Sequence, residues 1–187
     1  MEQRKGSNQH LANSSEPPLV GIIMGSDSDL EVMAEAFQVL TNFGVPAEIA
    51  VASAHRSPQR VSEYASSASE RGLKVIIAGA GGAAHLAGVV AAETSLPVIG
   101  VPIASSPLAG WDALLATVQM PAGVPVAAMA VGKAGARNAA ILAAQILSVV
   151  DDDLQLKLKR YKEELAEKVA ESAASLPEKL SKMQSKA

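Results

Sequence analysis

Apolar and polar stretches alternate along the chain in the manner of a parallel α/β protein. Five short apolar runs are separated by segments in which apolar residues recur with helical spacing. Continuous apolar runs are typical of strands covered on both faces. We therefore predict a sheet of about five parallel strands with helices on both sides. The expected strands are 19–24, 47–52, 75–78, 97–101 and 126–131, and the expected helices are 30–43, 58–71, 83–94, 111–118 and 134–149.

The chain divides into three parts by composition. Residues 1–18 are polar and lack an apolar signal segment, so we expect a disordered leader there. Residues 19–150 carry the α/β pattern and form the predicted catalytic domain. Residues 151–187 are richer in charge and follow the spacing of an amphipathic helix, which is predicted as a C-terminal extension. Its apolar face could pack on the same domain or on a neighbouring subunit, and the sequence leaves both open.

Composition excludes several functional classes. The net charge is −3 and aromatic residues make up 3%, so neither a basic patch nor a base-stacking surface for nucleic acid is expected. The chain has no cysteine, and its three histidines are far apart in sequence, so we predict no metal site. The uncharged stretch 94–111 contains three prolines and does not resemble a membrane span. A cytoplasmic protein is the simplest interpretation.

Three loops that follow predicted strands are candidates for a ligand site, because ligands of parallel sheets bind beyond the carboxyl ends of the strands. The first is Gly25-Ser26-Asp27-Ser28-Asp29, at the start of a helix. Unpaired backbone N–H groups and hydroxyls at such a position suit a phosphate, and a carboxylate suits ribose hydroxyls. The same residues would also serve as an ordinary helix cap.

The second candidate loop is Ser53-Ala54-His55-Arg56-Ser57-Pro58. Histidine exchanges protons near neutral pH, and arginine can bind a phosphate or carboxylate with two hydrogen bonds. His55 is therefore the leading candidate for proton transfer. A purely structural histidine is the plainer alternative.

The third candidate loop is glycine-rich and runs from Gly79 through Gly81, Gly82 and His85 to Gly88. Glycines allow a backbone to approach a ligand closely. Gly79, Gly81 and Ala84 formally match a dinucleotide fingerprint, but no acidic residue follows at the required distance. From its residues alone, the chain is predicted to be a metal-free α/β enzyme that binds an anionic small molecule.

Taken together, the motifs resemble the N5-carboxyaminoimidazole ribonucleotide mutase (PurE) family. The resemblance covers about residues 19–151. It rests on the stretches GIIMGSDSD, SAHRSP, GLKVIIAGAGGAAHLAG, LPVIGVP, VQMPAGVPV and GKAGARNAAILAAQIL. It implies a flavodoxin-like three-layer sandwich, usually assembled as a homo-octamer. It also implies transfer of a carboxylate from the exocyclic nitrogen to a ring carbon of an aminoimidazole ribonucleotide, without ATP, metal or organic cofactor.

The resemblance also assigns roles to single residues. His55 would be the general acid and base of the reaction. Substrate would be bound by the phosphate ligands Ser26 and Arg56, by Asp29 at the ribose, and by Ser28. Ser53 and Ala54 would place the His-Arg pair. The pocket for the base and carbon dioxide would be lined by Ala80, Gly81, Gly82 and His85.

Three other functions compete with the mutase. The first is a direct carboxylase that adds carbon dioxide to aminoimidazole ribonucleotide with the same fold and histidine. The segment GAGGAAHL resembles the mutase class instead. The second is a flavin-binding module, which would need aromatic residues that the loops lack. The third is a scaffold assembled through residues 151–187, which leaves the His-Arg loop unexplained.

Overall fold

A computed structural model describes residues 10–184 of the chain. Within it, residues up to Ile146 form one compact unit, and residues from Leu147 onward form a second. The first unit contains a six-stranded sheet in the order β1-β3-β2-β4-β5-β6. Its strands are β1 (Leu11–Ala12), β2 (Val20–Met24), β3 (Ala47–Val51), β4 (Val75–Ala80), β5 (Val98–Pro102) and β6 (Ala127–Ala128).

The five strands β2 to β6 are all parallel, as the apolar runs predict. Along the sheet their order by position in the chain is second, first, third, fourth, fifth, which is the flavodoxin order. Every residue of β2 and β5 is buried, which explains why these runs lack polar alternation. The flavodoxin-like fold expected from the sequence is confirmed, with one further strand, β1, at the sheet edge.

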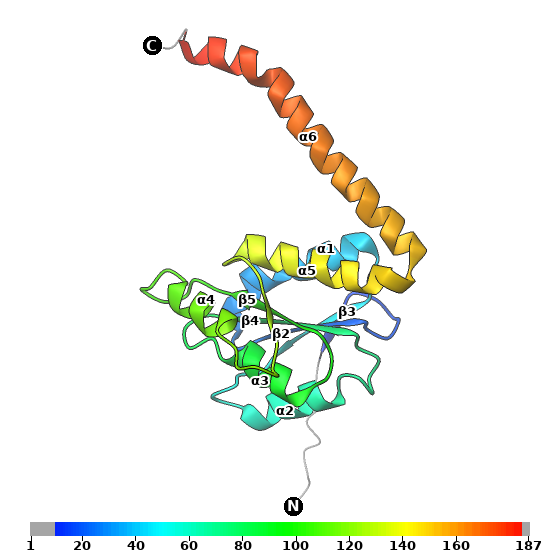
Figure 1. Ribbon diagram of the computed structural model, residues 1–187, viewed down its shortest axis with the longest axis vertical. Helices are drawn as coiled ribbons and strands as arrows, with labels where there is room; N and C mark the ends of the chain where they lie inside the picture. The colour runs from blue at the N-terminus through cyan, green and yellow to red at the C-terminus, as the bar shows by residue number, and fades with distance from the viewer. Residues whose placement is uncertain (1–9, 185–187) are drawn as a thin grey trace, which may run out of the picture. The chain divides into compact units, whose positions relative to one another are not determined.

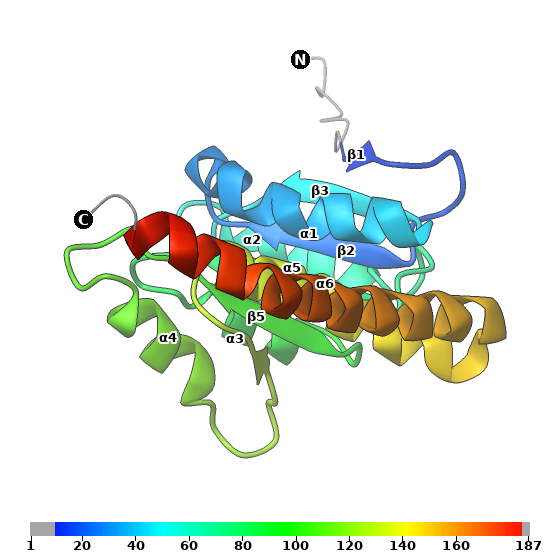
Figure 2. The same cartoon turned by 90° about the horizontal axis from the view of Figure 1, so that it is seen from above.

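Helices cover the sheet on both faces (Figure 1). The helices α1 (Leu30–Phe43) and α5 (Lys133–Leu147) lie on one face, and α2 (Pro58–Ser67) and α3 (Leu86–Glu93) on the other. Figure 2 looks onto the first face and shows α1 along β2 and β3. The helix α4 (Trp111–Val118) lies against β5 and β6. These two covering layers leave only the strand ends open to a ligand.

Several helices begin or end at other residues than the sequence predicts. A short 3-10 turn, η1 (Asp27–Asp29), precedes α1. The helix α2 stops at Ser67 instead of residue 71 and passes into turns. The helix α3 begins only at Leu86, because Ala83 has a positive φ of 53° that a helix does not accept. The strand expected over 126–131 is reduced to two residues.

Residues 10–18, part of the segment expected to be a disordered leader, follow a defined path along the sheet edge. The strand β1 pairs antiparallel with β3. The Asn13 side chain donates to the Val45 carbonyl (3.0 Å) and accepts from the Ala47 N–H (2.8 Å). His10 Nδ1 lies 3.2 Å from the buried Glu48 carboxylate. These polar contacts compensate for the low apolar content of the segment, and residues 1–9 lie outside the described residues.

The second unit is helical, as the charged composition predicts. It consists of a 3-10 turn, η2 (Ser148–Val150), and the long helix α6 (Asp152–Gln184). Asp151 caps α6 by accepting the Leu154 N–H at 2.9 Å. Pro177 lies inside α6, and residues 185–187 of the predicted extension lie outside the described residues. No helix among the described residues is both long and apolar enough to cross a membrane.

Candidate active site

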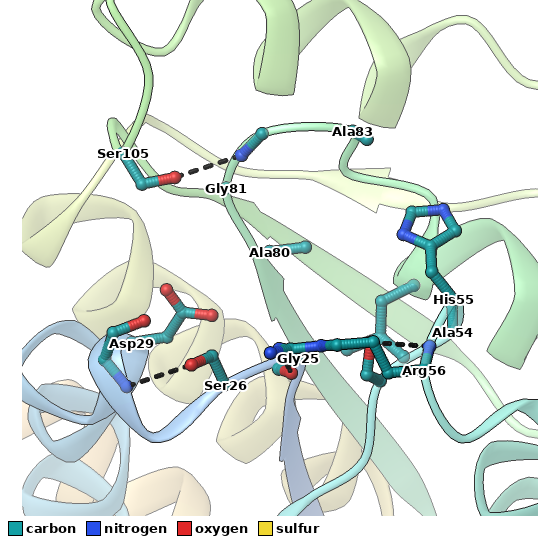
Figure 3. A pocket seen from close by; sticks show the side chains of 14 residues that line it. Gly25, Ser26, Asp29, Ala54, His55, Arg56, Ala80, Gly81, Ala83 and Ser105 are labelled. Carbon is teal, nitrogen blue, oxygen red and sulfur yellow. Dashed lines mark hydrogen bonds between the residues drawn. The ribbon is translucent and has the colours of Figure 1, made fainter.

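One cavity of about 320 Å³ opens where the strand order reverses, at the carboxyl ends of β2, β3 and β4. This is the switch point at which flavodoxin-like sheets bind ligands. All three candidate loops reach it (Figure 3). The lining residues are Gly25, Ser26, Ser28, Asp29, Ser53, Ala54, His55, Arg56, Ala80, Gly81, Gly82, Ala83, Leu86 and Ser105.

The loop after β2 forms one wall of the cavity. Ser26 is the N-cap of the 3-10 turn, and its hydroxyl accepts the Ser28 N–H at 3.3 Å. Asp29 is buried, and this burial raises the pKa of its carboxyl. A hydrogen bond from the Ser26 backbone and the Arg56 charge oppose the rise only in part. The wall thus combines hydroxyls at a helix start with one desolvated carboxylate.

The loop after β3 is held in shape by its own serines. Ser53 Oγ accepts the Arg56 backbone N–H at 3.2 Å, and Ser57 Oγ accepts the Ser53 N–H at 3.0 Å. The Arg56 side chain then crosses to the loop after β2, where Nη2 donates to the Gly25 carbonyl at 2.8 Å. Arg56 is exposed, so its remaining donors are accessible to an anion in the cavity.

His55 and His85 meet at the rim of the cavity. His55 Nε2 and His85 Nδ1 are 2.9 Å apart, and the rings lie edge to face with centroids 5.0 Å apart. One of these nitrogens must carry the shared proton, so His85 restricts the tautomer of His55. His55 lines the cavity, whereas His85 contacts His55 from outside the lining residues. From the sequence, both histidines are predicted to line the pocket.

The loop after β4 is the third wall. The Ile103 N–H donates to the Ala80 carbonyl at 2.9 Å and extends the β4–β5 pairing beyond the strands. Ser105 Oγ accepts the Gly82 N–H at 3.0 Å. Ala83 adopts a left-handed conformation that costs a residue with a Cβ about 1–2 kcal/mol. Strain of this kind persists where the surrounding contacts determine the backbone.

The structure therefore brings together every residue that the sequence predicts for the site, with His85 one contact further out. It adds four lining residues to which the sequence assigns no role. Gly25, Ala83 and Leu86 lie within the candidate loops, and Ser105 lies outside them. Ser105 offered one signal, because it follows the carboxyl end of the strand next to β4. The left-handed backbone of Ala83 offered none, because alanine is not a usual residue there.

The cavity combines a histidine for proton transfer, an arginine and hydroxyls for an anion, a buried carboxylate for sugar hydroxyls, and a glycine-rich wall that a planar ring can approach. This combination at a flavodoxin-type switch point defines a class: α/β enzymes acting on a phosphorylated small molecule. The chain belongs to the AIR carboxylase family, whose model matches residues 19–168.

The relatives at high identity carry one name. The N5-carboxyaminoimidazole ribonucleotide mutase of Pyrococcus horikoshii is 56% identical over 90% of this chain and 94% of its own. The protein of the same name from Bacillus subtilis is 59% identical over 85% of this chain and 98% of its own. A crystal structure of Treponema denticola PurE superposes with a TM-score of 0.76 at 32% identity, covering 85% of this chain and 98% of that one. The family match ends at residue 168, within α6.

Proposed function

We propose that this protein is an N5-carboxyaminoimidazole ribonucleotide mutase of purine biosynthesis. The observation that carries the proposal is the single cavity in which His55, Arg56, Asp29 and the Gly81–Gly82 backbone converge. Relatives at 56% and 59% identity are named for this activity. The reaction is an isomerisation, so substrate and product have the same atoms.

The chemistry requires one group that both gives and takes a proton. In the first step the bond between the carboxyl carbon and the exocyclic nitrogen breaks. Its electron pair stays on nitrogen, which accepts a proton, and carbon dioxide is released inside the cavity. The ring carbon then attacks carbon dioxide, and the proton on that carbon is removed. His55 gives the first proton and takes the second, and its neighbour His85, 2.9 Å away, selects the nitrogen that faces the substrate.

The other lining residues bind and orient the ribonucleotide. Arg56 together with Ser26 and Ser28 binds the phosphate, because the helix start and the guanidinium both favour an anion. Asp29 accepts hydrogen bonds from the ribose hydroxyls.

The remaining roles belong to backbone and supporting groups. Ser53 and Ala54 place the His-Arg pair. The backbone of Ala80, Gly81 and Gly82 lines the space for the base and carbon dioxide. The reaction as proposed uses no ATP, metal or organic cofactor.

A direct carboxylase is the alternative within the same fold. It would make the same product from aminoimidazole ribonucleotide and carbon dioxide. The high-identity relatives are named as mutases, which favours the mutase. The test supplies either N5-carboxyaminoimidazole ribonucleotide or aminoimidazole ribonucleotide with bicarbonate, in both cases without ATP, and measures carboxyaminoimidazole ribonucleotide. We expect efficient formation only from the N-carboxylated substrate, and the reverse preference would reject the mutase.

We further propose that the protein acts in the cytoplasm as a homo-octamer, as the family resemblance implies. Exposed apolar side chains on and beside α4 support assembly, because a monomer rarely exposes such a patch to water. They are Leu108 (61% exposed), Trp111 (67%), Leu115 (53%) and Val118 (50%).

A further inference from the structure

Ser105 lies beyond β5, next to the loop that follows β4. The register of these strands pairs Ala80 with Pro102. Beyond that pair the Ser105 N–H donates to the Ile103 carbonyl at 3.0 Å, a bond two residues back that turns the chain sharply. The turn directs the Ser105 side chain toward the Gly81–Gly82 backbone, as Figure 3 shows.

Two observations show that Ser105 holds this backbone in place. Its Oγ accepts the Gly82 N–H at 3.0 Å. Its side chain also packs directly over the Gly81 Cα, because a Cβ built on Gly81 would overlap Ser105 Oγ and lie 2.8 Å from Ser105 Cβ. Position 81 must therefore be glycine for Ser105 to reach Gly82. The glycine at this position serves the serine contact as well as the approach of a ligand.

The segment that Ser105 holds forms the wall of the cavity that lines the proposed space for the base and carbon dioxide. Ala80, Gly81 and Gly82 line the cavity together with Ser105 and His55. The wall has no side chain longer than methyl at these three positions, so neither of its glycines can be anchored by a side chain of its own. It depends on contacts from the neighbouring loop, and the adjacent Ala83 is already strained at a φ of 53°.

We propose that Ser105 is a positioning residue that keeps released carbon dioxide inside the site by fixing the Gly81–Gly82 wall. The inference rests on the proposed mutase function, in which carbon dioxide is free between bond breaking and bond formation. When the Gly82 N–H loses its acceptor, the wall gains freedom and the cavity opens at this side. Carbon dioxide then exchanges with the medium before the ring carbon attacks it.

The test measures exchange directly. The full chain converts N5-carboxyaminoimidazole ribonucleotide in buffer that contains ¹³C-labelled bicarbonate, with carbonic anhydrase present to label dissolved carbon dioxide. Mass spectrometry of the product at early times gives the labelled fraction. We expect little label with the unaltered protein and roughly five- to tenfold more with Ser105→Ala, at a lower kcat and with KM changed less than about threefold.

Each variant is assayed at the concentration that gives the same rate of product formation, because unfolded molecules form no product and the N-carboxylate of free substrate itself exchanges with bicarbonate over time. Ser106→Ala is the matched control. Ser106 Oγ bonds to Asp112 Oδ1 (2.9 Å) and to the Leu108 N–H (3.1 Å), and Ser106 does not line the cavity. Its labelled fraction should equal that of the unaltered protein. Ser105→Thr keeps a hydroxyl, so its labelled fraction should stay close to that of the unaltered protein. If Ser105→Ala yields no folded protein, Ser105→Cys, with a weaker acceptor, replaces it.

Equal labelling in Ser105→Ala and the unaltered protein would overturn the proposal, as would equal increases in the alanine and threonine variants. The proposal is supported if the labelled fraction rises in the alanine variant but stays at the level of the unaltered protein in the threonine variant. If the unaltered protein forms no product from the N-carboxylated substrate, the proposed function itself fails, and the role of Ser105 in it fails as well. The two failures are therefore distinguishable by the unaltered protein alone.

Discussion

His55 and Arg56 are adjacent in sequence but are expected to act on different parts of the substrate. Replacing His55 with Asn removes the proton carrier and should lower kcat by about 10²–10⁴-fold, while product binding measured by calorimetry stays within about threefold. Near-normal turnover in His55→Asn would contradict the assignment of His55.

Replacing Arg56 with Ala should chiefly raise KM, because the guanidinium contributes binding rather than proton transfer. Unchanged substrate affinity in Arg56→Ala would count against a phosphate role.

Asp29 illustrates a conflict between function and stability. Burial raises the pKa of its carboxyl above the ordinary value of 3.8. The folded state therefore holds the proton more tightly than the unfolded state, and stability falls as the pH rises above about 3.8. Asp29→Asn should melt at a higher temperature than the unaltered protein at pH 7, with the difference shrinking below pH 4. Its KM should rise about tenfold or more from the lost ribose contacts. An Asn variant that melts lower at pH 7 would show that the carboxylate is stabilised rather than strained.

The first turn of α5 lies in close contact with the loop that precedes this helix. A Cβ on Gly135 would overlap the carbonyl oxygen of Ala130, which is backbone and cannot rotate away. Gly135→Ala should therefore lower the free energy of unfolding by more than about 3 kcal/mol, despite the better helix propensity of alanine. Asn138→Ala, an exposed position on the same helix, serves as the control and should leave stability unchanged or slightly raised. Urea denaturation of both variants makes the comparison.

The strand β3, next to the edge strand β1, carries a buried ionic cluster that fastens β1 to the sheet. Burial alone would raise the pKa of Glu48, but the hydrogen bond and charge of Arg71 dominate, with His10 contributing, and the pKa lies below its ordinary 4.5. Tyr64, stacked on His10 and beneath the Arg71 guanidinium, completes the cluster. A carboxyl with a lowered folded pKa stabilises the protein above the unfolded value, and this contribution is lost as the pH falls below about 4.5.

Glu48→Gln should consequently lower stability by about 1–3 kcal/mol at pH 7, since Arg71 loses its charged partner. The deficit should narrow steadily between about pH 5 and pH 3 as the unaltered protein loses the same interaction. Melting temperatures of both proteins across this pH range test the prediction. If the stability difference between Glu48→Gln and the unaltered protein does not change with pH, the charge of Glu48 does not contribute to stability and only its packing does.

At the level of the whole molecule, we expect the full chain to sediment with eight times the mass of one subunit. The family match ends at residue 168, and every lining residue of the cavity lies in the first compact unit. Removing residues 169–187 should therefore leave both the octamer and kcat/KM within about twofold. Analytical ultracentrifugation and the mutase assay measure the two properties. Loss of assembly on truncation would place an essential contact in the last turns of α6.

Local patterns along the sequence determined the fold class and most of the site. The five parallel strands and the order of helices follow from apolar runs and helical spacing, because burial on both faces leaves a continuous apolar signature. The three loops could be assigned to one site since carboxyl ends of parallel strands meet at one edge of the sheet. Each of these inferences depends only on neighbours in the chain and on general rules for parallel sheets.

Tertiary structure alone decided the contacts between distant segments. The pairing of His55 with His85, the support of Gly82 by Ser105 and the attachment of His10 to Glu48 each join residues more than 20 positions apart. Such contacts depend on strand register and on loop conformation, including the left-handed backbone at Ala83, and neither leaves a periodic pattern in the sequence. The chemical groups could therefore be predicted from the sequence, whereas the partners that orient them required the folded chain.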